Sequence, residues 1–575
     1  MEREISPATH MQAFNLNLTS SLFNSVQGTK AVVFDQPLFR LFDSFISYTS
    51  MSQNYGIKRN LSLYNLTEVD VDHAFYFLTP NANIAKQALA HVLRIAKSKS
   101  IKGIHIRFLP EASMAITNIF KECNFTEIEL TISALPIYWI TLDTFSLTLC
   151  DPNVLFKNVV HNDVVSLHKC AHAISQLDIQ TRNTATLRYH GEMSKIVTNI
   201  LLQLRINEQK SPQKSVVKKI EINDIIIIDR FVDPITPLLI PSTFDGLIDE
   251  FFEVDSCGNV TVDTLELKDR TSLEKNEKPR IKLSLNDEYY QSIRDLHIGA
   301  VAPVISQTLK ELTKQENQAR DVSNSVAVYK MLVSKLNEFV KQKKSCNQYL
   351  RLVEMIFKRL SEDIIQDLLD CQTEILEGIY LGDKVIPFLE CNLISGKEFL
   401  RTVRLICLQS IVNNGLKKDT LKNYQRLIVQ TYGIHKLQFL IKLQMAGLLS
   451  EKNGSIKKTP SSFNFENFAS TKRTFNLLPK DVVDSVGQKD ASYAFNGYAP
   501  LLVRFLEKNS RVDWSDFKTK QSSQLTTNSD EEDGKKMLFV IGGLTRAESS
   551  CIKLHFKVIS STEFISGNQF INAFE

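Results

Sequence analysis

The chain has 575 residues, of which 43% are apolar and 23% are charged, and its formal net charge is +4. This length predicts two to four domains, and the composition is typical of an ordinary soluble protein. The sequence has no apolar run of the ~18 residues that a membrane-spanning helix needs, and its amino terminus has no apolar core of a secretory signal. The nine cysteines include no Cys-x-x-Cys pair, which favours a reduced, cytosolic protein.

The first third of the chain alternates predicted strands and helices. Clusters of β-branched and aromatic residues predict strands at 31–35, 74–78 and 103–108. Apolar residues at helical spacing, followed by basic residues, predict a helix at 84–99. We therefore expect a parallel α/β domain at residues 1–132.

A run of four isoleucines that begins at Ile225 predicts a strand buried on both faces, as in a parallel sheet. Asp229, Arg230 and Asp233 follow at the carboxyl end of this strand, which is where open α/β sheets usually bind their ligands. A proline-containing turn at Pro237 then leads the chain away from the sheet.

From residue 238 to about 478 the apolar spacing is helical. Residues 301–312 and 326–340 form two such patterns, joined by a polar link at 316–323 in which Ser323 is a candidate N-cap. Together they predict an αα-hairpin.

Strand patterns return at 537–541 and 556–559, and two strands are too few for a domain of their own. We expect them to complete the earlier sheet, which makes the central domain discontinuous. The expected domains after the first are a central α/β domain at 133–237 and 480–575, a hairpin subdomain at 238–350 and a second helical subdomain at 351–479.

The sequence lacks the common nucleotide-binding and hydrolase motifs. Gly542 and Gly543 follow a predicted strand and could cradle a phosphate, but a tight turn with close helix packing is favoured. His168 and His172 share one helix face without a third ligand, so no zinc site is expected.

Asp229, Asp233, Asp245 and Asp249 could suggest a divalent metal. We expect instead that Asp229 bonds nearby backbone or arginine groups and that the others cap helices and turns. The sequence therefore predicts no catalytic, cofactor-binding or metal-binding residues.

The segment from Lys397 to Lys458 is strongly basic, with twelve Lys and Arg residues against three Asp and Glu residues, a net charge of +9. Nucleic acid, an anionic membrane surface and an acidic partner protein are all compatible with it, as is a solvated face. A winged-helix pattern near Met445 keeps DNA binding open, but no zinc-finger or RNA-binding motif supports it.

Several segments resemble, in order, the Sec/Munc (SM) family of SNARE-binding proteins, with the vacuolar-sorting class C subgroup nearest. These segments are Ile225–Leu239, Thr243–Glu250, Arg401–Ser410, Gln430–Gly433, Ser492–Leu501 and Phe539–Glu548. The sequence departs from the family pattern at Thr184–Thr186, where a glycine-rich turn is usual. The resemblance implies a three-domain arch with two parallel-sheet α/β domains, a large mainly helical insertion and a cleft for SNARE helices.

The resemblance also implies the partners. The class C subgroup belongs to the HOPS and CORVET tethers, which act at the late endosome and at the lysosome or vacuole. The expected partners are SNARE proteins and the large class C vacuolar-sorting subunit, with peripheral membrane association through partners, no nucleic acid and no stable homo-oligomer. A related SM subunit of a different endosomal complex and a nucleotide-binding α/β enzyme with a helical insertion are the alternatives.

The hairpin corresponds to the family's template for aligning SNARE helices, so Tyr329, Val333 and Leu336 are candidate SNARE contacts. The subgroup's partner contact falls at Ile434 and Leu437. In the alternative arrangement Leu437 packs inward with Ile441, and only Ile434 is exposed. Asp229, Arg230, Asp233 and Pro237 are expected to be structural.

Overall fold

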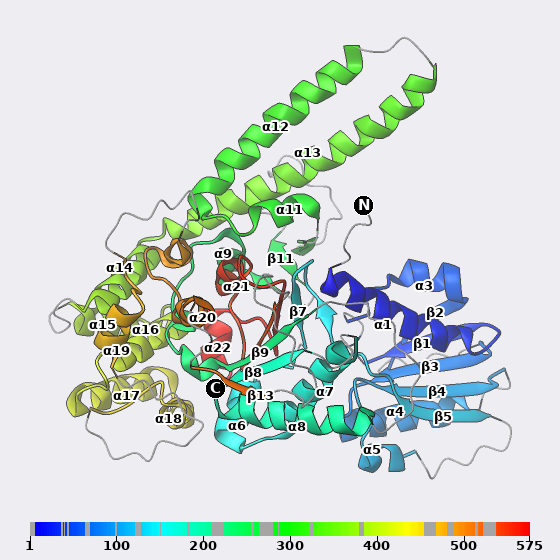
Figure 1. The fold of residues 1–575 in the computed structure, drawn as a ribbon, viewed down its shortest axis with the longest axis horizontal. Helices are drawn as coiled ribbons and strands as arrows, with labels where there is room; N and C mark the ends of the chain where they lie inside the picture. Colours follow the sequence, from blue (N-terminus) through cyan, green and yellow to red (C-terminus); the bar gives the residue numbers. More distant parts are fainter. Residues whose placement is uncertain are drawn as a thin grey trace. The chain divides into compact units, whose positions relative to one another are not determined.

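The computed structural model describes residues 6–35, 38, 41–42, 45–63, 70–97, 100–120, 128–149, 151–180, 185–209, 222–254, 258–263, 280–285, 287–321, 326–378, 384–452, 467–479, 488, 490–511, 514, 516–520 and 536–575. Its contacts divide the chain into two compact units, Met1–Cys150 and Asp151–Glu575. Figure 1 draws both units. The finer domain limits given above stay predictions.

The first unit is built on a parallel sheet in the order β2-β1-β3-β4-β5 (Figure 1). Its strands are β1 (Lys30–Phe34), β2 (Ile57–Ser62), β3 (His73–Leu78), β4 (Gly103–Phe108) and β5 (Glu129–Ala134). The three predicted strands agree with β1, β3 and β4 to within one residue. The two edge strands, β2 and β5, carry more polar residues, so their sequences lack the buried-strand pattern.

Helices cover both faces of this sheet because alternate strand residues point to opposite sides. Val33 joins a core with Val92 of α4 (Ala82–Ile95), while Val32 joins a second core with Phe23 of α1 (Pro7–Asn24) and Met51 of α3 (Tyr48–Tyr55). The helix predicted at 84–99 corresponds to α4, which ends at Ile95, the last residue that it buries. The unit also contains α5 (Met114–Asn118) and the antiparallel pair β6 (Ile140–Thr141) and β7 (Ser146–Thr148).

The larger sheet of the second unit has the strand order β13-β8-β9-β14-β15 within that unit. These strands are β8 (Thr186–His190), β9 (Asp224–Asp229), β13 (Lys518–Lys520), β14 (Lys536–Ile541) and β15 (Val558–Ser561). Only β13 is antiparallel to its neighbour. The isoleucine strand β9 is paired with β8 on one side and with β14 on the other, which accounts for its burial on both faces. The helices beside this sheet are α6 (Val154–His161), α7 (Val165–Gln180), α8 (Glu192–Gln209), α20 (Leu501–Arg511), α21 (Arg546–Ile552) and α22 (Gly567–Asn572).

The residues between β9 and β14 begin with two 3-10 turns (Arg230–Val232 and Thr236–Leu238), α9 (Phe244–Phe251) and α11 (Glu288–Ile293). A small antiparallel sheet lies in the same part, formed by β10 (Glu253–Val254), β11 (Asn259–Asp263) and β12 (Arg280–Ser284). It was not predicted, because its strands are short and a long polar stretch separates β11 from β12.

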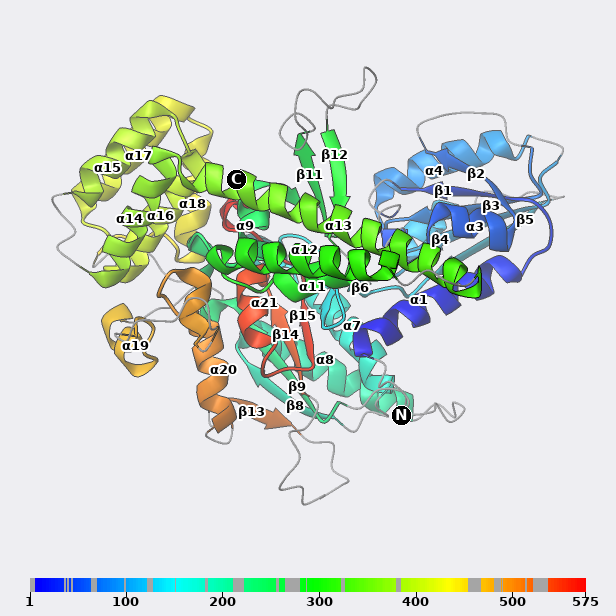
Figure 2. The same cartoon turned by 90° about the horizontal axis from the view of Figure 1, so that it is seen from above.

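Two long helices form the predicted hairpin, α12 (Ile298–Asp321) and α13 (Val326–Leu360), which lie side by side in both views (Figures 1 and 2). The predicted link at 316–323 is wrong in part, because α12 continues to Asp321. Glu316, Gln318 and Arg320 of this predicted link are good helix formers even though they are polar. Ser323 lies outside the described residues.

The remaining helices of this part follow α13 in the chain (Figure 2). They are α14 (Asp363–Glu377), α15 (Val385–Ser395), α16 (Phe399–Val412), α17 (Lys418–Tyr432), α18 (Lys436–Ala446) and α19 (Phe468–Thr474). Among them, α16 packs against α14 and α15, and α17 packs against α15 and α18.

Candidate functional site

Asp229 ends strand β9 and caps helix α8. Its carboxylate accepts hydrogen bonds from the backbone N–H groups of Met193 (2.9 Å) and Ser194 (2.7 Å) and from the Ser194 hydroxyl. Burial raises the pKa of this carboxyl to about 7, although these hydrogen bonds oppose the rise. Gly191, with φ +117°, makes room for it, because a Cβ there would lie 2.1 Å from Asp229 Oδ2. The Asp229 carboxylate thus occupies the amino-terminal end of α8, where a helix can otherwise bind an external anion.

Arg230 and Asp233 join this strand end to distant segments. The Arg230 guanidinium contacts both carboxylate oxygens of Glu548 in α21 at 2.9 Å and donates to the Asp233 carbonyl. The Asp233 carboxylate accepts from the N–H groups of Thr236 (3.0 Å) and Leu502 (2.9 Å), the latter at the start of α20. These buried residues therefore stabilise the fold, because removing one member of a pair would leave the charge of the other buried without a partner.

The expectation that Asp245 and Asp249 cap helices or turns is wrong, because both face arginines. Asp245 Oδ2 lies 2.9 Å from Arg294 Nη2, Asp245 Oδ1 accepts from Arg546 at 3.2 Å, and Asp249 lies 3.7 Å from Arg546. Burial raises the pKa of Asp249 to about 6. The sequence does not show these pairings, because the arginines lie tens to hundreds of residues away.

Glu250, the next acidic residue of α9, pairs with α16. Arg401 Nε and Arg404 Nη1 each lie 2.7 Å from Glu250 Oε1. Arg404 also donates to the carbonyls of Leu238 (3.0 Å) and Leu239 (2.8 Å). Sequence analysis missed these roles. Arg404 stands within the apolar run Val403–Leu408, and an arginine in such a run indicates a buried charge that needs an acidic partner.

Gly542 and Gly543 form a tight turn. Gly542 N–H donates to the Thr562 hydroxyl at 3.1 Å, and a Cβ on Gly543 would lie 2.6 Å from Ile565 Cδ1. The turn therefore serves close packing, which was the favoured interpretation.

A nearby cavity lined by Pro237, Asp249 and Arg546 measures about 10 Å³, room for one water molecule. No group of three metal-ligating side chains occurs among the described residues, His168 and His172 included.

The root of the hairpin is buried in the second unit. Val301 and Ile305 of α12 are fully buried, and the Tyr349 ring of α13 packs 5.4 Å from that of Tyr290. Val304, which lies between the two buried residues of α12 in the chain, is 38% exposed, and Val340 of α13 is 60% exposed. The backbone at Tyr329, Val333 and Leu336 belongs to α13, but the side chains of these three candidate contacts lie outside the described part.

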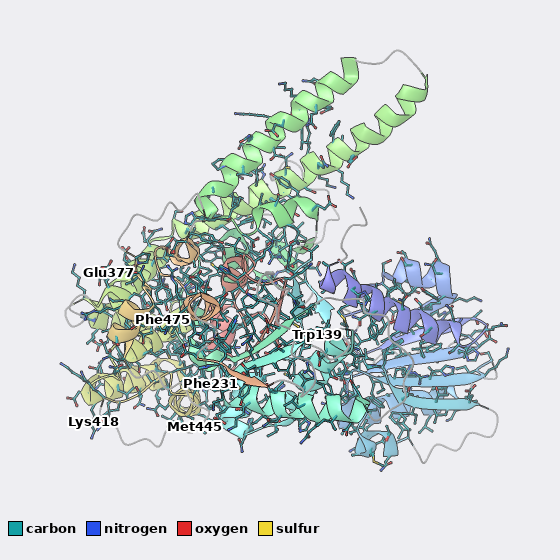
Figure 3. The ribbon with its side chains drawn as sticks, viewed as in Figure 1. Trp139, Phe231, Glu377, Lys418, Met445 and Phe475 are labelled. Atoms are coloured by element: carbon teal, nitrogen blue, oxygen red, sulfur yellow. The ribbon has the colours of Figure 1, made fainter. Side chains whose placement is uncertain are left out.

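Helix α18 and the residues before it expose a row of apolar side chains. Ile434 is 72% exposed, and Leu437, Ile441 and Met445 are 39%, 47% and 36% exposed. The alternative in which Leu437 packs inward with Ile441 is therefore wrong. The inward face is formed by other apolar residues, namely Phe439, Leu440, Leu443 and Ala446. Apolar residues of α18 thus lie on its outer side as well as on its inner face, and among the described residues the outer row has no cover. Figure 3 labels Met445 on this helix.

Two lysines fix α18 against the rest of the second unit. Lys436 Nζ lies 2.5 Å from Glu575 Oε1, and Lys442 Nζ donates to the Glu575 carbonyl at 3.0 Å. Lys442 also lies 5.2 Å from the centre of the Phe156 ring in α6. The inner face of α18 is thus held in place, and its outer row stays accessible.

The basic segment divides into two groups. Arg401, Arg404, Lys436 and Lys442 have the partners described above. In the described part of this segment, residues 397–452, six other cations are exposed, against Asp419 as the one exposed acid. They are Lys397, Lys417, Lys418, Lys422, Arg426 and Lys452. In the described part of the chain, no helix combines the length and hydropathy of a membrane span.

The family model of the Sec1 family matches residues 30–573. The chain belongs to the Sec1 family. Vacuolar protein sorting-associated protein 33A of Caenorhabditis elegans is 27% identical, and the match covers 97% of this chain and 95% of that protein. The rat protein of the same name is 24% identical, with 95% and 94% covered. The predicted resemblance to the SM family is confirmed.

Solved structures of Sec1-family proteins share the fold of this chain. The SM protein Vps45 in complex with the Qa SNARE Tlg2 gives a TM-score of 0.64 at 13% identity, covering 98% of this chain and 97% of Vps45. The Unc18–syntaxin 1 complex from Monosiga brevicollis gives 0.61 at 15% identity, with 99% of each chain covered. The predicted fold class, an SM fold with parallel-sheet α/β parts and a large helical insertion, is confirmed.

Proposed function

We propose that this Sec1-family chain binds SNARE proteins and templates their assembly for membrane fusion, as a subunit of the HOPS and CORVET tethers. It acts by binding and is not an enzyme. The main support is the family match over residues 30–573, together with relatives named for vacuolar protein sorting that align over nearly their full length. Structures with the same fold include complexes with SNARE proteins. The proposed location is peripheral, on late endosome and lysosome or vacuole membranes.

The choice of the HOPS type over the related subunit rests on similarity. Within Caenorhabditis elegans, the protein named 33A is 27% identical to this chain and the one named 33B is 21% identical. Copurification of the tagged chain from cytosol, read for the large tether subunits, separates the two possibilities.

The hairpin α12–α13 is the proposed SNARE site. Holding two SNARE helices in register removes part of their ordering cost before they associate. Changing Tyr329 and Val333 together to Asp should weaken binding of purified SNARE domains at least tenfold and leave the melting temperature unchanged. Changing Gln342 and Asn347 to Asp is the matched control, since both are exposed polar residues of α13. Loss of folding in the first variant would assign Tyr329 and Val333 to the core instead.

The exposed row on α18 and just before it is the proposed docking face for the large class C subunit, with Ile434 and Leu437 at its amino-terminal end. Apolar side chains inside a charged rim are the usual site of binding hot spots, where truncation costs ~2 kcal/mol or more. Ile434→Lys should abolish copurification with the tether subunits while SNARE binding persists. Gln366→Lys, which adds the same charge at an exposed polar position of α14 away from this row, is the control. Wild-type copurification of the Ile434 variant would refute this docking face.

A further inference from the structure

A stripe of exposed cations runs along helix α17. Lys418, Lys422 and Arg426 follow one another at intervals of four residues, so successive members lie about 6 Å apart along one helix face, and Lys417 adjoins the first. The opposite face of α17 is buried through Leu421, Tyr424 and Ile428. Figure 3 labels Lys418 at the outer edge of this helix. We call Lys417, Lys418, Lys422 and Arg426 the α17 stripe.

Neither helix stability nor internal ion pairing explains this stripe. Lys417 and Lys418 stand at the amino-terminal end of α17, where the helix dipole disfavours positive charge. Among the described residues, none of the three lysines forms an ion pair, whereas Arg401, Arg404 and Lys436 nearby in sequence all do. The unpaired cations are therefore available to an external anion.

We propose that the α17 stripe binds the anionic phospholipid surface of a membrane directly. Three cations on one helix face with a fourth at the N-cap form the kind of basic cluster that associates with anionic lipid, and each cation adds to the attraction. A protein partner would need an apolar centre. The exposed residues next to the lysines of this stripe in the chain, Asn414 and Asp419, are polar, and the exposed apolar row begins only at Ile434. This contact goes beyond the proposed function, in which the membrane is reached through partners.

Cosedimentation of the full chain with vesicles tests the proposal. Vesicles of neutral phosphatidylcholine would be compared with the same vesicles containing about 30% phosphatidylserine, at low and at physiological ionic strength. The Lys417, Lys418 and Lys422 to Glu triple variant should lose about a hundredfold in partition to the anionic vesicles, and more salt should weaken the wild-type binding. Lys58, Lys86 and Lys358 to Glu is the control, because it changes net charge equally at exposed sites elsewhere.

The proposal is overturned if the triple variant binds anionic vesicles like wild type or if the control variant loses as much. It is also overturned if the triple variant keeps its vesicle binding and loses copurification with the tether subunits, which would make the stripe a protein-binding surface. Ile434→Lys separates this proposal from the docking face. That variant should lose the tether subunits and keep vesicle binding.

Discussion

Replacing His105 by Gln should make the first unit less sensitive to acid. His105 Nε2 lies 3.2 Å from Nδ1 of His73, and its Nδ1 lies 2.8 Å from the Thr131 hydroxyl. Gly103 makes this contact possible, because a Cβ there would lie 2.7 Å from His73 Nδ1. Arg107 donates to the Thr131 oxygen at 3.1 Å, so the threonine proton is free to donate to His105. The proton of neutral His105 then lies on Nε2 and is donated to His73.

Neither imidazole can take up a second proton without breaking this chain of hydrogen bonds. Burial, and then the nearby His73 and Arg107, lower the pKa of His105 from about 6.5 to about 4, and burial also lowers the pKa of His73. Below pH 6.5 the unfolded chain binds a proton that the folded chain does not, so stability falls as the pH falls. For His105, which is 3% exposed, linkage gives a loss of about 2 kcal/mol at pH 5 relative to pH 8.

Urea unfolding at pH 8 and pH 5 measures this loss. The chain has two tryptophans, and Trp139 is buried in the first unit, so a Trp514→Phe background makes its fluorescence report that unit. His105→Gln keeps an N–H donor for His73 but cannot titrate, so it should lose about 2 kcal/mol less than its parent between the two pH values. His555→Gln, in the second unit, should behave like the parent. Equal losses in the parent and the His105 variant would refute the protonation argument.

Three further predictions concern the second unit. Gly191→Ala should lower the unfolding free energy of the second unit by about 3 kcal/mol or more, because the new Cβ overlaps the Asp229 carboxylate. The control is Gly396→Ala, which should cost about 1 kcal/mol, because Gly396 has φ +73° but no atom within 4 Å of the new Cβ. Glu250→Gln should cost about 3 kcal/mol in urea unfolding, since Arg404 keeps its buried charge without a counterion. Millimolar ATP or GTP with magnesium should leave the melting temperature unchanged, and a rise equivalent to about 2.7 kcal/mol would reveal a bound nucleotide.

Local patterns determined most of the regular structure. The four isoleucines from Ile225 predicted β9, and the apolar spacing at 84–99 predicted α4, because burial on a strand or helix face imposes a period that is visible in the sequence. Motifs in order along the chain were enough to indicate the family. The candidate docking residues Ile434 and Leu437 were also named from the sequence, although their function stays a proposal.

Tertiary structure decided how these elements meet. The spacing of apolar residues shows that a helix has an apolar face, but it does not show which neighbour covers that face. Only the fold shows that α18 buries Phe439 and Leu443 and leaves Ile441 exposed. The pairing of Asp245 with Arg546 depends on segments that are 301 residues apart, and nothing local to either residue specifies it. Such a charge is buried only because the folded chain brings its counterion into contact, and the free energy of that contact exists in the tertiary structure alone.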